Sequence, residues 1–327
     1  SLCHGLTPST IKFETNEGSW MSLDVSPNGD WLVFELLGDL YQLPIDGGVA
    51  KPIVSGRDFA SQPRFSPDGK QLVFVSDRSG EDNLWLVNID SGELKQVSTR
   101  NDGELISPAW SRDGRTIYVS QLASRRSMNT NIELWTYPVD GSKPGKISSP
   151  NMGRSAMLVS TFPPGAYGPQ PSANNSEVFF TAAAPRQHGS TAGPRAEIMK
   201  VNLLNGLTET VSGISMPAFK PQLSSDGKWL VFGALHANKT GLRLRNLKTG
   251  NERWLVQDIG FNALESWASR DLLPGFAFTP TNESLVIAYN GKIRQINLSD
   301  GKVTHIPFRA NVQMEVESRV TTIAAID

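Results

Sequence analysis

Residues 61–98, SQPRFSPDGKQLVFVSDRSGEDNLWLVNIDSGELKQVS, contain the pattern that decides the fold. A Ser-Pro-Asp-Gly turn at Ser66–Gly69 separates two apolar segments, and a hairpin at Asp90–Gly92 separates two more. Glycine takes positive φ and aspartate bonds its own backbone, so both stretches favour tight turns between strands. We therefore predict four strands, over Ser61–Phe65, Gln71–Ser76, Asn83–Ile89 and Leu94–Ser98.

The same unit recurs along the chain, and each copy contains a polar turn that begins with serine or threonine. We call it the anchor turn. Successive anchor turns start 40, 45, 61, 52 and 55 residues apart, a period that is typical of propellers and solenoids. Their aspartates, such as Asp68, are assigned to turn geometry and not to catalysis. The first residues of the anchor turns are Ser26, Ser66, Ser111, Ser172, Ser224 and Thr279.

The segment after each anchor turn is apolar without alternation, as in Leu72–Val75 and Leu230–Phe232. A strand covered on both faces has this pattern, and strands between neighbouring blades of a propeller are covered in this way. We predict one all-β domain over residues 1–327, a six-bladed β-propeller of four-stranded antiparallel blades, with seven blades as the alternative. Ile11–Thr15 is expected to close the ring, and the seven-bladed count would add Thr321–Ile326.

Two of the four kinds of connection vary in length. The anchor turns and the hairpins between third and fourth strands stay short, whereas Gln121–Asn131, Ser148–Gly168, Ala183–Ala196 and Gln257–Leu273 are long. Both long kinds leave an up-and-down blade at the same face, so we predict the partner-binding face there. Aromatic and charged side chains are the favoured anchors for a partner. The candidates are Trp267, Glu265, Arg57, Asp58, Arg100, Asp102, Arg126 and His188.

Charge and motifs exclude several function classes. The net charge is −1, from 31 basic and 32 acidic residues, so nucleic-acid binding has no electrostatic basis. No stretch approaches the ~18 apolar residues of a membrane span, and we expect no membrane insertion. The single cysteine, Cys3, cannot form an intrachain disulfide. Because no G-x-S-x-G elbow, phosphate-binding loop or zinc-spaced His/Cys set occurs, we predict no catalytic residues, no metal and no cofactor.

The second copy resembles the Tol-B-like propeller repeat, a WD40-like repeat. The likeness rests on Ser66–Gly69, Leu72–Val75, Ser76–Gly80 and Asn83–Trp85. Later copies depart from that repeat, since Asn174-Asn175 and Thr281-Asn282 replace the Asp-Gly pair. Asparagine serves the same turn role, so the departure leaves the array intact.

A narrower resemblance involves the ends of the chain. Phe13–Ser22, Gly38–Tyr41, Glu265–Ala268 and Ile306–Phe308 are similar to the amino-terminal propeller region of secreted amidohydrolase-related proteins. In that family the propeller precedes a metal-dependent hydrolase barrel that needs an HxH motif, and no two of the four histidines here are two residues apart. The resemblance implies a fragment of a longer chain or a propeller-only relative, in a periplasmic or secreted location.

Two functions follow from these observations. The first is a non-catalytic scaffold that binds a protein or peptide partner, or that supports an attached metal-dependent amidohydrolase domain absent from this chain. The second is a stand-alone hydrolase or lyase with its site in the axial funnel. Residues scattered over several blades would leave no sequence motif, so the sequence leaves enzymatic activity open.

Overall fold

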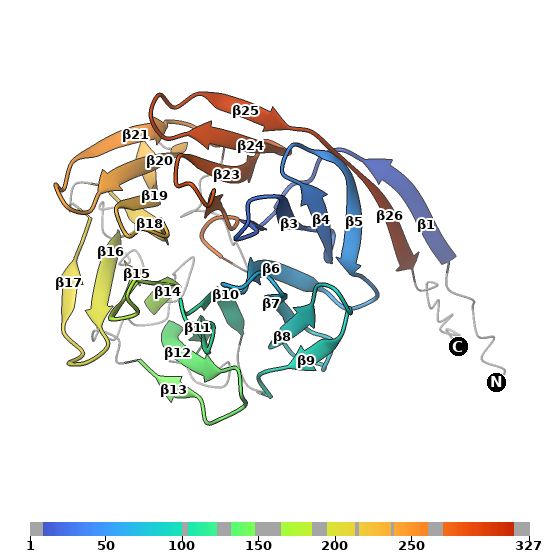
Figure 1. Cartoon of the computed structure of the whole chain (residues 1–327), viewed down its shortest axis with the longest axis horizontal. Helices are drawn as coiled ribbons and strands as arrows, with labels where there is room; N and C mark the ends of the chain where they lie inside the picture. The colour runs from blue at the N-terminus through green and yellow to red at the C-terminus, as the bar shows by residue number, and fades with distance from the viewer. Residues whose placement is uncertain are drawn as a thin grey trace, which may run out of the picture.

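A computed structural model describes residues 9–99, 104–122, 132–147, 165–184, 195–212, 216–236, 239–260 and 271–316. Every regular element within these ranges is a β-strand. The sheets are arranged around a common axis in a disc, and a two-stranded ribbon leaves the rim (Figure 1). The predicted all-β propeller is confirmed.

Three sheets contain four antiparallel strands each, hydrogen-bonded in chain order. The bounds predicted for the first of them agree with the structure to within two residues. The three sheets are β6 (Ala60–Phe65), β7 (Gln71–Ser76), β8 (Asn83–Asn88) and β9 (Leu94–Gln96); β18 (Ala218–Leu223), β19 (Trp229–His236), β20 (Lys239–Asn246) and β21 (Glu252–Val256); and β22 (Ala277–Phe278), β23 (Ser284–Tyr289), β24 (Lys292–Asn297) and β25 (Val303–Ile306).

An eight-stranded sheet joins two runs of strands through one parallel pair, Ile132 with Gly165. Glycine is needed at this pair, because a Cβ on Gly165 would lie 2.2 Å from the carbonyl oxygen of Ile132. The two runs are β10 (Leu105–Trp110), β11 (Thr116–Leu122), β12 (Ile132–Pro138) and β13 (Gly145–Lys146), and β14 (Gly165–Pro171), β15 (Glu177–Ala184), β16 (Arg195–Asn202) and β17 (Thr208–Thr210).

A six-stranded sheet carries the ribbon. β26 pairs with β5 in parallel orientation only over Phe308–Ala310. From Ala310 to Val316 it pairs with β1 in antiparallel orientation. Figure 1 shows this ribbon, β1 and β26, extending away from the disc toward both termini. In hydrogen-bonded order the sheet contains β1 (Ser9–Thr15), β26 (Phe308–Val316), β5 (Gly48–Val54), β4 (Asp39–Pro44), β3 (Trp31–Leu36) and β2 (Leu23–Val25).

The expected division into six or seven blades of four strands each is wrong. Strands of the described residues form five hydrogen-bonded sheets, of which only three have four strands. Two pairings cause the difference, Ile132 with Gly165 and β26 with β5. Both pair a strand of one copy with a strand beyond that copy, so comparing copies of the repeat could not reveal them.

Ile11–Thr15 does not close the ring, which corrects a second expectation. It belongs to β1 at the outer edge of the six-stranded sheet, whereas β22–β25 form the last sheet without it. Direct contacts close the disc instead: the Leu23 N–H donates to the Gly275 carbonyl (3.0 Å), and the Gly275 N–H donates to the Ser22 hydroxyl (2.9 Å). Thr321–Ile326 lies outside the described residues.

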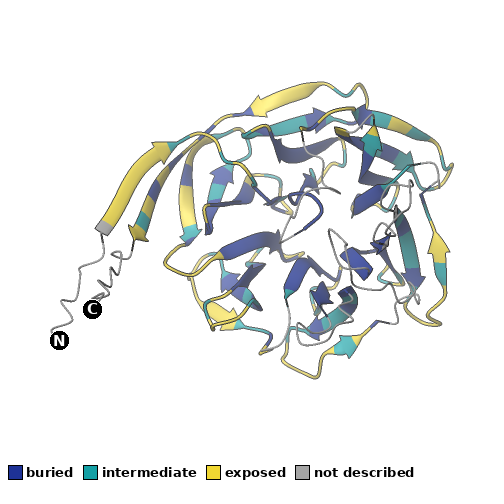
Figure 2. Cartoon of the chain, turned by 180° about the vertical axis from the view of Figure 1, so that it is seen from behind, coloured by how far each residue is buried: buried dark blue, intermediate teal, exposed yellow. Residues whose placement is uncertain are grey.

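The apolar segment after each anchor turn forms the core, as its pattern predicts. Strands near the axis are buried and strands at the rim are more exposed (Figure 2). One residue from each of these segments has no solvent-accessible surface: Leu32, Leu72, Ile117, Val178, Leu230 and Leu285.

The anchor turns share one hydrogen-bond pattern. Ser66 Oγ donates to Asp68 Oδ1 (2.6 Å) and accepts from the N–H of Gln71 (3.0 Å). The bond from Ser66 lowers the pKa of the Asp68 carboxyl. The same two bonds recur in the turns that start at Ser26, Ser111, Ser172 and Ser224. The assignment of the repeated aspartates to turn geometry is confirmed.

Candidate functional site

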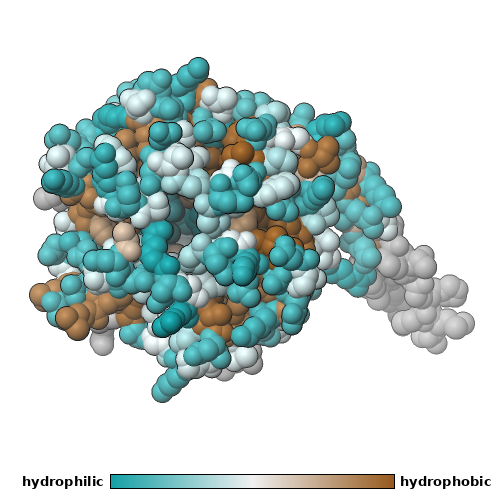
Figure 3. All heavy atoms as spheres, viewed as in Figure 1, coloured by the Kyte–Doolittle hydropathy of each residue, from teal (hydrophilic) through white to brown (hydrophobic). Residues whose placement is uncertain are grey.

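A cavity of about 340 Å³ opens on the axis between the anchor turns. Residues of five anchor turns line it, among them Ser26, Ser66, Arg112, Ser225 and Thr279. The face shown in Figure 3 is mostly hydrophilic and is hollowed near its centre. Because successive strands are antiparallel, the cavity lies at the opposite end of the strands from the long connections.

Six residues that line the cavity occupy equivalent positions in the repeat, two residues before the first residue of an anchor turn. Side chains alternate along a strand, so this position faces the axis in every copy. Four of the six are polar, although they belong to the strands nearest the axis. We call this set the pocket ring: Asp24, Arg64, Ala109, Gln170, Gln222 and Ala277.

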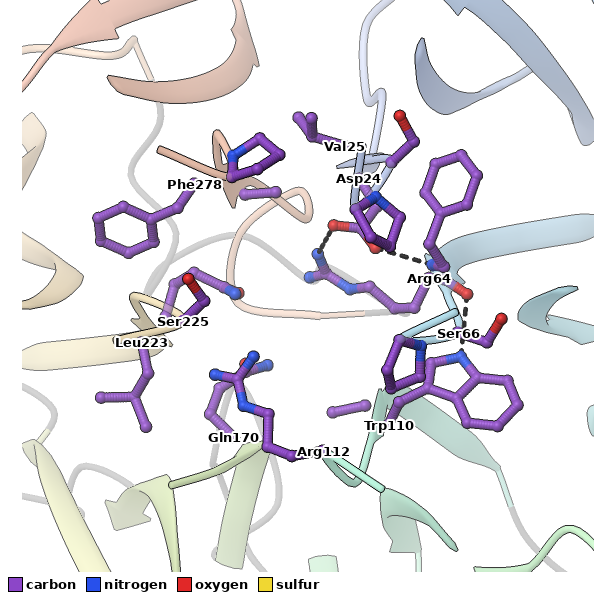
Figure 4. A pocket seen from close by; sticks show the side chains of 18 of the residues that line it. Asp24, Val25, Arg64, Ser66, Trp110, Arg112, Gln170, Leu223, Ser225 and Phe278 are labelled. Atoms are coloured by element: carbon purple, nitrogen blue, oxygen red, sulfur yellow. Dashed lines mark hydrogen bonds and ion pairs between the residues drawn. The ribbon is translucent and has the colours of Figure 1, made fainter. Parts of the chain in front are cut away.

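Arg64 and Asp24 form a fixed pair inside the cavity (Figure 4). Arg64 Nη1 lies 3.5 Å from Asp24 Oδ1 and donates to the carbonyls of Leu23 (3.3 Å) and Phe276 (3.2 Å). Burial raises the pKa of Asp24, while the guanidinium of Arg64 and the N–H of Phe65 oppose that rise. The Arg64 side chain is thus held in place by its neighbours, and it adds a fixed positive charge to the lining of the cavity.

Arg112 supplies a second cation. Its backbone N–H donates to Asn175 Oδ1 in the adjacent anchor turn (2.9 Å), which fixes the residue without using its side chain. The Arg112 and Gln170 side chains point into the same space (Figure 4). The guanidinium of Arg112 forms no hydrogen bond or ion pair with another described residue. Two arginines and one aspartate therefore give the cavity an excess of positive charge.

A second set of equivalent residues lies two positions before the pocket ring in each copy, and all of its members are buried. Its members lie four residues before each anchor turn, and β-bulges in β6, β10, β14 and β18 fall at this place. At three of these bulges a non-glycine residue, Gln62, Ser107 or Lys220, has a φ near +55°. This conformation is uncommon for such residues and marks a constrained position. We call the set the bulge ring: Ser22, Gln62, Ser107, Gly168, Lys220 and Gly275.

A charged cluster joins two bulge-ring residues to a third segment. Lys220 Nζ pairs with Asp271, the Ser107 hydroxyl donates to the same carboxylate, and Lys220 Nζ lies 3.3 Å from Ser107 Oγ. Burial lowers the pKa of Lys220, and the Asp271 carboxylate opposes this shift. The three residues are only 3–4% exposed, and the Ser107 proton is engaged by Asp271. The cluster therefore holds two strands near the axis to the segment that contains Asp271, and it is shielded from solvent.

Of the residues predicted from the sequence, only two are described, and they lie away from this cavity. Arg57 and Asp58 are described and exposed, and neither lines it. Arg57 instead pairs with Glu315 of β26 (2.9 Å). The predicted partner-binding face at the long connections stays a prediction. The other candidates lie outside the described residues: Trp267, Glu265, Arg100, Asp102, Arg126 and His188.

Sequence reasoning missed the pocket ring, although the sequence contains a signal for it. Asp24, Arg64, Gln170 and Gln222 are polar residues at one fixed distance before an anchor turn. Aligning the copies on that turn brings the four together. Connection length, the criterion that selected the other face, carries no information about inward-facing strand positions.

Two negative findings apply to the described ranges only. They contain no group of three or more His, Cys, Asp or Glu residues placed to hold a metal ion. They also contain no helix with the length and apolar character of a membrane span.

Comparison with known proteins agrees with the propeller fold. A family model, the Tricorn protease N-terminal β-propeller domain, matches residues 23–162. The uncharacterized peptidase YuxL of Bacillus subtilis is 25% identical over 60% of this chain, and the Tol-Pal system protein TolB of Anaeromyxobacter dehalogenans is 24% identical over 46%. The crystal structure of TolB from Acinetobacter baumannii superposes with a TM-score of 0.63 at 16% identity, covering 90% of this chain and 66% of that one. The chain is a TolB-like β-propeller.

This TolB-like propeller spans 24% of the length of YuxL and 32% of that TolB relative. A structure of oligogalacturonate lyase in complex with manganese also superposes, with a TM-score of 0.55 at 13% identity over 96% of this chain and 97% of that one. At such low identity the likeness shows the fold alone. The narrower resemblance to amidohydrolase-related proteins stays a prediction.

Proposed function

We propose that this TolB-like propeller is a non-catalytic scaffold whose axial cavity binds a protein or peptide segment that presents a carboxylate. The observation behind the proposal is Arg112, whose guanidinium reaches the cavity and forms no hydrogen bond with another described residue. A guanidinium binds a carboxylate through two parallel N–H donors, a geometry that few other ligands satisfy.

The pocket ring complements such a ligand. Gln170 and Gln222 each offer an amide donor and an amide acceptor, which suits the polar backbone of a peptide. Arg64 is already held by Asp24 and two carbonyls, so it adds positive potential without rearranging. A preorganised wall of this kind lowers the entropy lost on binding.

The size of the cavity limits what can enter it. A volume of about 340 Å³ lies at the lower end of the range typical of ligand pockets. The cavity suits a chain end or a few side chains, and the rest of a partner would lie across the surrounding anchor turns.

The partner is a separate protein or a domain attached to the same polypeptide, such as the expected metal-dependent amidohydrolase. The curated relatives, of which this chain spans a third or less, support the second arrangement. We further propose a periplasmic or secreted location, which fractionation of cells that produce the full-length protein would test.

The test of the binding proposal compares two labelled peptides that differ only at the carboxyl terminus, one with a free carboxylate and one amidated. Fluorescence anisotropy should show weaker binding of the amidated peptide. Replacing Arg112 by glutamine should remove this difference and weaken binding about tenfold, since a hydrogen bond to a charged group contributes roughly 1.5–3 kcal/mol.

Arg115→Gln is the matched control. Arg115 follows the same anchor turn, is exposed and does not line the cavity, so its loss should leave binding unchanged. Equal binding of both peptides, or equal effects of the two arginine substitutions, would contradict the proposal.

The alternative is a stand-alone hydrolase or lyase with a site in the axial funnel. The oligogalacturonate lyase structure has the same fold and nearly the same extent, so the fold is compatible with an enzyme, because one fold can host unrelated functions. Incubating the purified chain with divalent metals and either generic esters and amides or oligogalacturonate would test it. Turnover that Arg64→Lys abolishes, with the fold intact by circular dichroism, would support a lyase or hydrolase and defeat the scaffold.

A further inference from the structure

A cavity away from the axis lies at the rim, between the ribbon and the sheet that carries it. It has a volume of about 780 Å³ and is lined by residues of β1, β4, β5 and β26 and by the segment that follows β5. We call it the wedge, because β5 and β26 pair at Phe308–Ala310 and separate beyond that point.

Two strand edges face the wedge. β5 has ladder partners in β26 only at Gly48, Val49 and Ala50, so Lys51–Val54 has none on that side among the described residues. Beyond Ala310, β26 pairs only with β1. Strand edges without a ladder partner are templates for an added strand, and binding by strand addition uses such edges.

The floor of the wedge contains a carboxylate. Asp39 is 7% exposed, and it accepts a hydrogen bond from the Gly56 N–H (3.2 Å). No cation forms an ion pair with Asp39 among the described residues. Desolvation raises the pKa of this carboxyl to about 6, and a cation arriving beside it would offset that desolvation.

The other charges around Asp39 lie farther out. Arg57 and Glu315 pair with each other across the wedge, at side-chain exposures of 53% and 52%. Lys12 of β1 also lines the cavity and is exposed. An exposed pair of this kind contributes little to stability, so an incoming chain can separate it at small cost.

We propose that the wedge binds an extended peptide segment of a partner protein as an added strand, with a lysine or arginine side chain directed at Asp39. The split between β5 and β26 supplies the backbone edges, and the single carboxylate without a cation supplies the side-chain preference. Phe13 and Tyr41 provide the apolar surface against which the stem of the basic side chain packs.

The test uses a short fluorescein-labelled peptide of alternating threonine and valine with a central lysine, and the same peptide with norleucine at the centre. Near neutral pH the lysine peptide should bind at least about tenfold more tightly, because it forms a charge-assisted bond to a buried group. The preference should decline as the pH falls below 6 and Asp39 becomes protonated. In Asp39→Asn both peptides should bind alike at every pH.

Asp58→Asn is the matched control, since Asp58 lies two residues beyond Gly56, is exposed and does not line the wedge. It should keep the full preference. Gln313→Trp, at an exposed position of β26 that lines the wedge, should block both peptides without unfolding the chain.

Equal affinity for the two peptides in the wild type, or a preference that survives Asp39→Asn, would overturn the proposal. Sedimentation that shows a dimer, lost in Gln313→Trp, would assign the wedge to a second copy of this chain and would also overturn it. Neither result depends on Arg112, so the axial-cavity proposal is tested separately.

Discussion

Two ion pairs lie in opposite surroundings, Lys220 with Asp271 near the axis and Arg57 with Glu315 at the rim. On the axis, the side chains of Lys220 and Asp271 are 4% and 1% exposed. At the rim, the side chains of Arg57 and Glu315 are 53% and 52% exposed. The charges are alike, so the difference between the pairs is almost entirely one of hydration.

Hydration decides what each pair can do. Separating a buried pair leaves a charge without water or partner, whereas separating an exposed pair returns both groups to solvent. The axis is therefore held in one arrangement, and it presents a rigid wall to the cavity above it. The ribbon can change its contacts at little cost, which suits a place where a strand is added.

The largest effect is expected on the axis. Lys220→Met should lower the free energy of unfolding by about 3–5 kcal/mol, because Asp271 would remain buried without its cation. Urea denaturation followed by tryptophan fluorescence measures this change. The double variant Lys220→Met/Asp271→Leu should recover much of the loss. A loss below about 1 kcal/mol in the single variant would mean that water reaches the cluster.

A smaller effect, with the opposite sign, is expected beneath the ribbon. The pKa of Asp39 is raised from 3.8 to about 6, so the folded state must ionise a buried acid at neutral pH and Asp39 is destabilising there. Asp39→Asn should therefore stabilise the protein near pH 7.5, by about 1–2 kcal/mol. Well below pH 3.8 the carboxyl is protonated in both states, so the advantage should vanish there. Thermal melts of both proteins across this pH range measure the difference in stability. If burial were not the cause, that difference would stay constant or change sign.

A substitution in an anchor turn should lower the free energy of unfolding by an amount between those expected for the axis pair and the rim pair. Ser66→Ala removes the acceptor for the Gln71 N–H and the donor to Asp68, and should cost about 1 kcal/mol. Ser91→Ala, in an exposed hairpin where Oγ accepts from the Glu93 N–H, should cost less than half of that. Equal losses in chemical denaturation would show that the anchor turn is no more constrained than the hairpin.

The smallest effect is expected at the rim pair itself. Arg57→Ala should change the free energy of unfolding by less than about 0.5 kcal/mol, because the pair is exposed and screened by salt. Melting curves at low and high salt would check both points. A loss comparable with that of Lys220→Met would remove the distinction between the two regions.

The sequence predicted the local strands and turns more accurately than it predicted how the strands are arranged into sheets. The turn at Ser66–Gly69 and the strands around it were located to within two residues, because turn chemistry and burial act over a few residues. The sheet count and the place of Ile11–Thr15 were wrong. Both depend on pairings between distant segments, such as β1 with β26, that no periodic signal encodes.

The candidate site shows the same division. Comparing copies of the repeat could have identified Asp24, Arg64, Gln170 and Gln222, because the strand period places equivalent positions on the axis. Asp271 and Asp39 belong to no such series. The fold alone brings Asp271 to Lys220 and places Asp39 beneath the ribbon.

By itself, then, the sequence determined an all-β propeller of anchored strands, since turn residues and buried apolar runs act through neighbours in the chain. The tertiary structure decided where charge is buried, which strand edges remain unpaired, and which face holds a cavity. Those properties depend on the exclusion of water by segments far apart in sequence, and hydration is set only once the sheets have packed around the axis.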